Sequence, residues 1–243
     1  MTGASSGIGR ATALALADRG ANVIVHGRDR PALEALAARL DGHALVADLA
    51  VPGAAEKLAR AALDLAERVD ILVNNAGLGW AGPFDGMPES EAERLMTVNL
   101  AAPVALTRAL LPGMRARGEG YLAYVTSIAG RTGVAGEAVY AATKAGLDAF
   151  AESLRLELRG TGIGVGVLVP GVIDTRFFER RGRPYARRRP RPLAPDPIGR
   201  DLAAMIASGR EELYRPAWLR LPVAVRSTIP ATYRALAGRF GGS

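Results

Sequence analysis

Apolar and polar positions follow two alternating patterns along the first 170 residues. Residues 8–19 carry apolar side chains at helical spacing and end at Gly20, which is typical of a helix followed by a glycine cap. Residues 21–27, 43–47 and 69–77 are short apolar runs, typical of strands buried on both faces. The alternation continues with helices expected at 31–40, 53–68, 89–116 and 138–159, and with strands expected at 121–127 and 162–171.

This order of elements predicts the fold class. Apolar strands separated by helices indicate a parallel sheet that helices cover on both faces. With right-handed crossovers, the result is an α/β, doubly wound, Rossmann-like sheet. A chain of 243 residues suits one such domain. We assign residues 1–215 to this single domain, with a substrate loop at 172–197, and residues 216–243 to a C-terminal tail.

The tail combines apolar residues at helical spacing with intervening arginines, and Pro222 and Pro230 interrupt it. Such an amphipathic basic pattern is compatible with docking on the domain itself, on a partner subunit or on a membrane surface. We favour docking on the domain itself.

The composition excludes several kinds of site. The chain has no cysteine, so disulfides, cysteine nucleophiles and thiolate metal sites are excluded, and a cytoplasmic location is expected. His26 and His43 are the only histidines, and we expect no metal site. No uninterrupted apolar run approaches the roughly 20 residues of a membrane span, and the N-terminus lacks a signal-peptide pattern.

The net charge of +7 is confined to one segment. Between residues 176 and 191 there are eight arginines and a single acid, Glu179, so the rest of the chain is neutral overall. We therefore do not expect a nucleic-acid-binding face. The segment is expected to be a solvated lid, and the alternative is that its arginines meet an acidic substrate handle such as the phosphates of an acyl-CoA or carrier-protein arm.

Residues 2–9 read TGASSGIG and open the first predicted helix. Glycines in such a turn let backbone amides approach a pyrophosphate, and the helix N-terminus adds partial positive charge. A glycine-rich turn also occurs for purely structural reasons, but its place at the start of a βαβ series favours cofactor binding.

The residues after the second expected strand bear on the choice of cofactor. An acid there would bind the ribose 2′-hydroxyl of NAD, whereas an arginine accommodates the 2′-phosphate of NADP. Gly27 and Arg28 stand at this position, followed by Asp29. Arg28 can pair with a phosphate and Gly27 leaves room for it, so NADP(H) is favoured. Asp29 leaves NAD(H) open, although it can instead cap the next helix.

Tyr140 and Lys144 are the strongest candidates for acid/base chemistry. On a helix these positions share one face, and a nearby ammonium lowers the pKa of a phenol. Ser127 ends the preceding strand, where the carboxyl ends of strands line a crevice. Asn99 lies in the middle of a predicted helix, an unfavourable place for asparagine unless it has a polar role there. A solvated Tyr–Lys pair and an exposed asparagine are the structural alternatives.

With these residues in place, the chain resembles the short-chain dehydrogenase/reductase family over roughly residues 2–215. Seven elements occur in family order and spacing: TGASSGIG at 2–9, Asp48-Leu49, NNAG at 74–77, Asn99, Ser127, YAATK at 140–144, and Pro170-Gly171 with Thr175. The resemblance implies hydride transfer between NADP(H) and a carbonyl or secondary alcohol, with dimers or tetramers. The alternative is a regulatory module that binds NADP(H) without turnover. The hydride belongs to the cofactor, so no metal is needed.

The resemblance also implies residue roles. Tyr140 is the general acid/base, Lys144 lowers its pKa and binds the nicotinamide ribose, Ser127 positions the substrate oxygen, and Asn99 holds a water. Asp48 and Leu49 meet the adenine. The implied cofactor residues are Gly3, Ser5, Ser6, Gly7, Ile8, Gly9, Arg28, Asp48, Leu49, Asn75, Ala76, Gly77, Tyr140, Lys144, Pro170, Gly171, Ile173 and Thr175. Substrate contacts are expected from Ser127, Phe177 and Trp80, with Phe178, Tyr185 and Phe84 nearby.

One departure from the family concerns the first strand. In the family a complete hydrophobic strand in the middle of the sheet precedes the threonine of the glycine motif, and here only Met1 stands before Thr2. A sheet without this strand leaves backbone groups unpaired and an apolar slot open. We therefore expect the first strand to be missing, the true start codon to lie upstream, and this chain to fold poorly. The alternative is a genuine variant that fills the slot in some other way.

Overall fold

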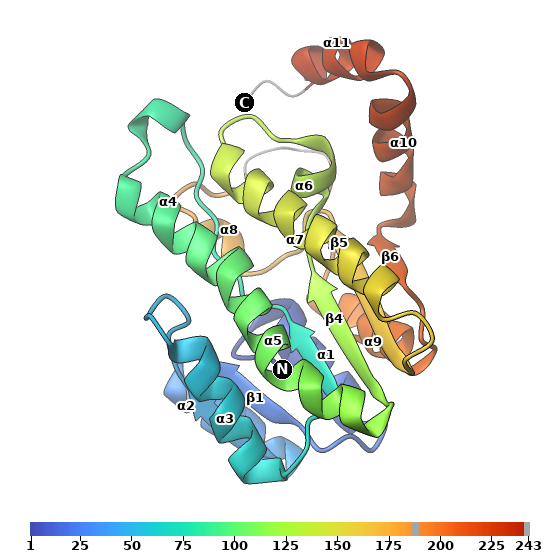
Figure 1. Cartoon of the computed structure of the whole chain (residues 1–243). Coiled ribbons are helices and arrows are strands. Elements are labelled where there is room, and N and C mark those ends of the chain that lie inside the picture. The colour runs from blue at the N-terminus through green and yellow to red at the C-terminus, as the bar shows by residue number, and fades with distance from the viewer. Residues whose placement is uncertain (186–189, 241–243) are drawn as a thin grey trace.

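The computed structural model describes residues 1–185 and 190–240, with the side chains of 238–240 left out. Within these residues all paired strands run parallel, in two groups (Figure 1). One group has the order β1–β2 and the other the order β3–β4–β5–β6. The bounds are β1 Ile24–Gly27, β2 His43–Val46, β3 Ile71–Asn74, β4 Gly120–Val125, β5 Ile163–Pro170 and β6 Glu212–Arg215. The predicted α/β parallel class is confirmed.

Helices cover both faces of the strands (Figure 1). They are α1 Gly7–Ala17, α2 Arg30–Leu40, α3 Ala54–Ala66, α4 Glu89–Met96, α5 Ala102–Arg117, α6 Ile128–Thr132, α7 Ala138–Glu157, α8 Phe177–Arg180, α9 Pro195–Ala207, α10 Arg220–Thr228 and α11 Pro230–Phe240. Alternate residues of β4 serve the two faces: Leu122 and Tyr124 pack in the core with α3, α5 and α7, while Ala123 and Val125 pack with α1 and α9.

The helix predicted at 89–116 is interrupted by a π-helical turn. α4 and α5 are joined by Thr97–Ala101, which contains Asn99. The whole stretch Glu89–Arg117 is long and apolar enough to cross a membrane by length and composition. Its side chains Leu106, Leu110 and Met114 are buried in the core beside the sheet, so we interpret it as a core helix.

The sequence prediction did not include α6, α8, α9 and β6. β6 extends the sheet beyond β5, and α9 starts at Pro195. The segment predicted as a substrate loop at 172–197 thus contains α8 and the start of α9, while its contact with substrate stays a prediction. The arginine and proline content of the segment hid the helical spacing of α9. Residues 186–189 of the predicted loop lie outside the described residues.

Met1 and Thr2 lie at the position where the family has its first strand, between β1 and β3. The Met1 amine donates to the Ile24 carbonyl at 2.9 Å, and the Met1 carbonyl accepts from the His26 amide at 2.9 Å. On the other side, the Thr2 amide donates to the Val73 carbonyl at 3.0 Å. These residues bridge β1 and β3, and among the described residues no strand separates the two groups. Met1 and Thr2 thus pair with strands of both groups, and the expectations about a missing first strand and its effect on folding stay predictions.

The tail contacts its own domain. Arg226 of α10 donates to the Arg131 carbonyl, and the Tyr233 hydroxyl of α11 donates to the Thr132 carbonyl at 3.1 Å. Pro222 lies in the first turn of α10 and Pro230 begins α11, so both prolines start helices rather than interrupt one. Both helices thus contact their own domain, but four residues of the predicted apolar pattern remain exposed: Trp218, Leu221, Ile229 and Leu236. What this apolar pattern docks on stays a prediction. Residues 241–243 of the predicted tail lie outside the described part of the chain.

We predict that Gly199→Ala destabilises the domain. α9 approaches α1 so closely at Gly199 that an added Cβ would lie 2.5 Å from the Ala11 Cβ and 2.4 Å from its carbonyl carbon. Such overpacking typically costs about 1–3 kcal/mol of unfolding free energy. The matched control is Gly113→Ala in α5, where the nearest atom is the flexible end of Arg117 at 3.3 Å. Denaturant unfolding should rank Gly199→Ala below the unmutated protein and Gly113→Ala at or above it.

Candidate active site

A cavity of about 660 Å³ opens at the carboxyl ends of the strands. All the residues that the sequence predicts as cofactor contacts line it, from the turn at Gly3 to Thr175 after β5. Ser127 and Phe177 also line this cavity. Residues from distant parts of the chain thus meet at one edge of the sheet, as the parallel fold predicts.

The glycine-rich turn before α1 is shaped for close backbone approach. Gly3 and Gly7 have backbone φ angles of +66° and +55°, which residues other than glycine rarely adopt. An added Cβ at Gly9 would lie 2.1 Å from the Gly3 carbonyl oxygen. The Asn75 amide fixes the turn by donating to the carbonyls of Thr2 and Gly3 at 3.0 and 3.1 Å. The turn and the N-terminus of α1 therefore fit a dinucleotide pyrophosphate.

Arg28 lines the same cavity as the glycine-rich turn. Its Nη1 lies 3.6 Å from Oδ2 of Asp48, and both side chains remain more than one-third exposed. Gly27 leaves only ordinary contacts around an added Cβ. Asp29 caps α2 by accepting from the Ala32 amide at 3.2 Å, as the alternative interpretation of this residue proposed. The carboxylate at this position thus has a structural role, and Arg28 is the side chain that faces the cavity.

Tyr140 and Ser127 form the polar centre of the other half. Ser127 caps α6 through the Ala129 amide at 3.1 Å, and its hydroxyl is hydrogen-bonded to the Tyr140 phenol. Lys144 follows one turn along α7, and all three residues are buried. The Lys144 Nζ donates to the Val125 carbonyl at 2.8 Å and lies 6.0 Å from the centre of the Tyr140 ring. The spacing predicted from the sequence therefore brings these groups together.

Asn99 connects three segments behind this centre. Its Oδ1 accepts from the Leu78 amide at 2.7 Å, and its Nδ2 donates to the Leu78 carbonyl at 2.9 Å and to Thr143 Oγ1 at 3.1 Å. The π-helical turn presents this fully buried amide, and such turns are frequent at functional sites. Asn99 thus fixes the segment after β3 against α7. The water that the family resemblance places on Asn99 stays a prediction.

Burial sets the proton affinities of the two acid/base residues. It raises the pKa of Tyr140 to about 12; the Ser127 hydrogen bond and Arg181 oppose this effect, and Glu137 adds to it. Burial lowers the pKa of Lys144 to about 8, against the effect of Asp148. In this structure the Lys144 ammonium is directed at the Val125 carbonyl. The effect of Lys144 on the pKa of Tyr140 stays a prediction.

Comparison with known proteins establishes the family. The family model described as short chain dehydrogenase matches residues 1–185. The chain belongs to the short chain dehydrogenase family.

Individual relatives agree with this assignment. An uncharacterized oxidoreductase of Myxococcus xanthus is 38% identical over 182 residues, covering 73% of this chain and 72% of the relative. The ketoacyl reductase HetN of Nostoc sp. is 36% identical over 179 residues, covering 72% of this chain but only 62% of the relative. A short-chain dehydrogenase from Sphingobium yanoikuyae, solved in complex with NADPH, has a TM-score of 0.83 and 30% identity, covering 98% of this chain and 91% of that one.

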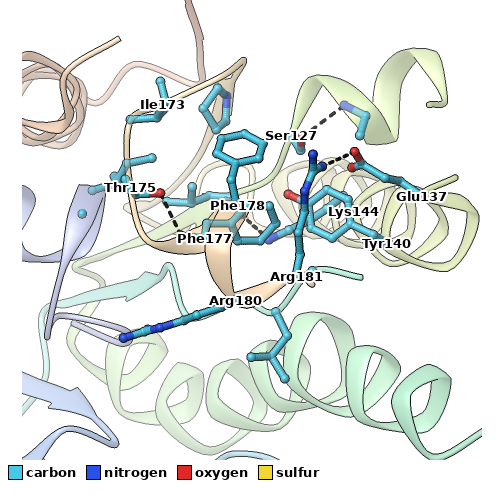
Figure 2. Close-up of a pocket in the computed structure, with 18 of the residues that line it drawn as sticks. Ser127, Glu137, Tyr140, Lys144, Ile173, Thr175, Phe177, Phe178, Arg180 and Arg181 are labelled. Atoms are coloured by element: carbon cyan, nitrogen blue, oxygen red, sulfur yellow. Dashed lines mark hydrogen bonds and ion pairs between the residues drawn. The ribbon is translucent and has the colours of Figure 1, made fainter. Parts of the chain in front are cut away.

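Aromatic side chains cover Tyr140 in this short-chain dehydrogenase. Figure 2 shows Phe177 of α8 beside Tyr140, and the two ring centres are 5.4 Å apart. Phe178 continues the row at 5.5 Å from Phe177, and Tyr185 follows at 5.3 Å from Phe178. The prediction that Trp80 contacts substrate needs correction. Trp80 lines a separate cavity of about 40 Å³ with Phe84, and its ring lies against Gly82. The main cavity is therefore roofed by the segment after β5.

Sequence reasoning missed several residues that line the main cavity. Glu137 and Arg181 lie beside Tyr140, and Pro222 and Tyr233 reach the cavity from the tail. Tyr233 follows the apolar helical pattern of the tail. Such a pattern indicates that the residue packs on something, but it does not indicate on which surface. Arg181 stands in an arginine-rich stretch, a composition that signals solvation. The sequence carries no signal that separates this arginine from its neighbours.

Proposed function

We propose that the protein is an NADP(H)-dependent oxidoreductase that interconverts a carbonyl and a secondary alcohol in an apolar small molecule. The observation that carries the proposal is one continuous cavity. Its first half is lined by the glycine turn and Arg28, and its second half by Ser127 and Tyr140. A site for a dinucleotide and an acid/base pair thus open into the same space, as hydride transfer requires.

The cofactor half favours NADP(H). The turn from Gly3 to Gly9 would hold the pyrophosphate, and Arg28 beside Gly27 would meet a 2′-phosphate. The similar Sphingobium enzyme was solved with NADPH, which supports this choice. When bound, the cofactor supplies the hydride that no protein side chain can provide.

The protein's own residues handle the proton. Ser127 would donate a hydrogen bond to the substrate oxygen and hold it beside the Tyr140 hydroxyl. With a pKa of about 12, the Tyr140 phenol is protonated at neutral pH. In the reductive direction its proton passes to the substrate oxygen, and Ser127 stabilises the phenolate that remains. The resting site is therefore poised as a proton donor.

The substrate half is mainly apolar. Its lining includes the rings of Phe177, Phe178 and Tyr185, together with the side chain of Val134. We infer a hydrophobic ketone or acyl thioester as substrate. A panel of such compounds tested for NADPH oxidation checks the proposal. Tight NADPH binding without oxidation by any compound would favour the regulatory module instead.

We predict that Tyr140→Phe removes turnover and leaves NADPH binding nearly unchanged. The substitution deletes the proton-transfer group and keeps the ring that packs on Phe177. Lys144→Met should reduce both turnover and binding, because this ammonium is expected to contact the nicotinamide ribose. Steady-state kinetics and NADPH fluorescence titration measure the two effects. Substantial reductase activity in Tyr140→Phe would contradict the mechanism.

A second prediction concerns Arg28. Arg28→Ala should weaken NADPH binding about ten- to a hundredfold while NADH binding changes little, because a charge-assisted contact of about 1.5–3 kcal/mol is lost. Arg30→Ala is the matched control, since Arg30 pairs with Glu34 on the surface of α2, with Nη1 3.2 Å from Oε1. Dissociation constants for both cofactors give the answer. Equal affinities for NADPH and NADH in the unmutated protein would rule out this role.

A further inference from the structure

One arginine of the arginine-rich segment is buried beside the catalytic tyrosine. The side chain of Arg181 is 9% exposed, whereas Arg176, Arg180 and Arg183 are exposed residues. A buried arginine is rare unless it is paired. Figure 2 shows Arg181 next to Tyr140, turned toward Glu137. This side chain therefore differs from the solvated lid that the composition predicts.

The contacts of Arg181 tie three segments together. Its guanidinium donates to the Glu137 carboxylate, and its Nε donates to the Arg183 carbonyl at 2.9 Å. The guanidinium also stacks over Phe178, 4.6 Å from the ring centre. Its backbone carbonyl accepts from the Ala81 amide at 3.3 Å. The segment after β5 is thus joined to the segment after β3 and to the start of α7.

The pair lies where it controls the cover of Tyr140. Glu137 immediately precedes α7, three residues before Tyr140, and Arg181 directly follows α8. α8 has only four residues, too few to be stable without tertiary contacts. Its Phe177 ring is seated against Gly79, where an added Cβ would lie 2.5 Å from the ring. Aromatic packing and the ion pair are therefore what hold α8 in place.

We propose that Arg181 is a positioning residue whose ion pair with Glu137 holds α8 closed over Tyr140 and so completes the acid/base site. This inference rests on the proposed oxidoreductase function. A buried pair loses much of its stability when one partner is removed, because the other charge is left uncompensated. Removing either charge should therefore open α8. The exposed arginines of the same segment should lack this effect.

The pair also adds charge at the phenol. Among the described residues, the polar or charged groups that face the Tyr140 phenol are Ser127 after β4, Glu137 before α7, Lys144 from α7, and Arg181 after α8. A cation favours the phenolate and an anion disfavours it. Opening α8 reduces the burial of the phenol in both variants and so lowers its pKa in both. The lost charges differ in sign, so the pKa of Tyr140 should be higher after loss of Arg181 than after loss of Glu137. A merely structural pair would give both variants the same pKa.

The test compares Arg181→Met and Glu137→Gln with the control Arg176→Met, which alters an exposed arginine of the same segment. The measurements are kcat/KM for alcohol oxidation against pH with saturating NADP⁺, the dissociation constant of NADPH, and trypsin cleavage within residues 176–185. We expect both test variants to lose about tenfold or more in kcat/KM and to be cleaved about tenfold faster, consistent with a broken buried pair. The acidic limb of this profile, where activity is lost as pH falls, should lie at higher pH in Arg181→Met than in Glu137→Gln.

Two further variants distinguish loss of the ion pair from general damage to the fold. Arg181→Lys should retain most of the closure, and the charge-swapped Glu137→Arg/Arg181→Glu variant should regain resistance to trypsin relative to each single change. Acidic limbs at the same pH in the two test variants, or cleavage rates equal to that of Arg176→Met, would overturn the proposal. An unmutated protein without turnover would defeat the proposed function alone, since cleavage still reports whether the pair closes α8.

Discussion

The common direction of the strands is the constraint on which the site depends. Because β1, β3, β4 and β5 are all parallel within their groups, the turns that follow them open toward the same cavity. Arg28, Asn75, Ser127 and Gly171 occupy these turns, although they are spread over more than half of the chain. A crossover helix must return the chain after each strand, so the N-terminus of α1 also points to this edge. One topological rule thus assembles both the dinucleotide end and the acid/base end.

Local spacing explains which parts of the site were predictable from the sequence. Tyr140 and Lys144 share a helix face by periodicity alone, and Ser127 follows a strand whose end is marked by its apolar run. The full role of Asn99 was not predictable. Its amide is satisfied by the Leu78 backbone 21 positions away, and the π-helical turn that presents it leaves no pattern in the sequence. Contacts between segments distant in sequence are the part that periodicity does not encode.

The errors share this origin. Trp80 was expected in the substrate cavity because it is a large apolar residue beside a motif, but apolar character does not specify which of two neighbouring cavities a ring lines. Arg181 was expected in solvent because its neighbours are arginines. Its burial depends on Glu137, 44 positions earlier, and on the ring of Phe178. Composition describes the average residue of a segment, whereas Arg181 differs from that average by being buried.

Burial of the acid/base centre gives the reaction a preferred starting state. Ionising the Tyr140 phenol at pH 7 from a pKa of about 12 costs about 7 kcal/mol, while Lys144, with a pKa of about 8, remains mostly protonated. Reduction begins from the neutral phenol and needs no prior ionisation. Oxidation begins from the phenolate, and it therefore needs positive charge close to the ring.

The two cations near the ring come from different parts of the structure. Lys144 comes from helix α7, whereas Arg181 comes from the cover formed by α8. Closing that cover adds a cation to a buried site, where each charge acts more strongly than in water. It also buries the phenol, which disfavours the phenolate. Cover position and phenol ionisation are thus coupled through both the charge of Arg181 and the burial of Tyr140.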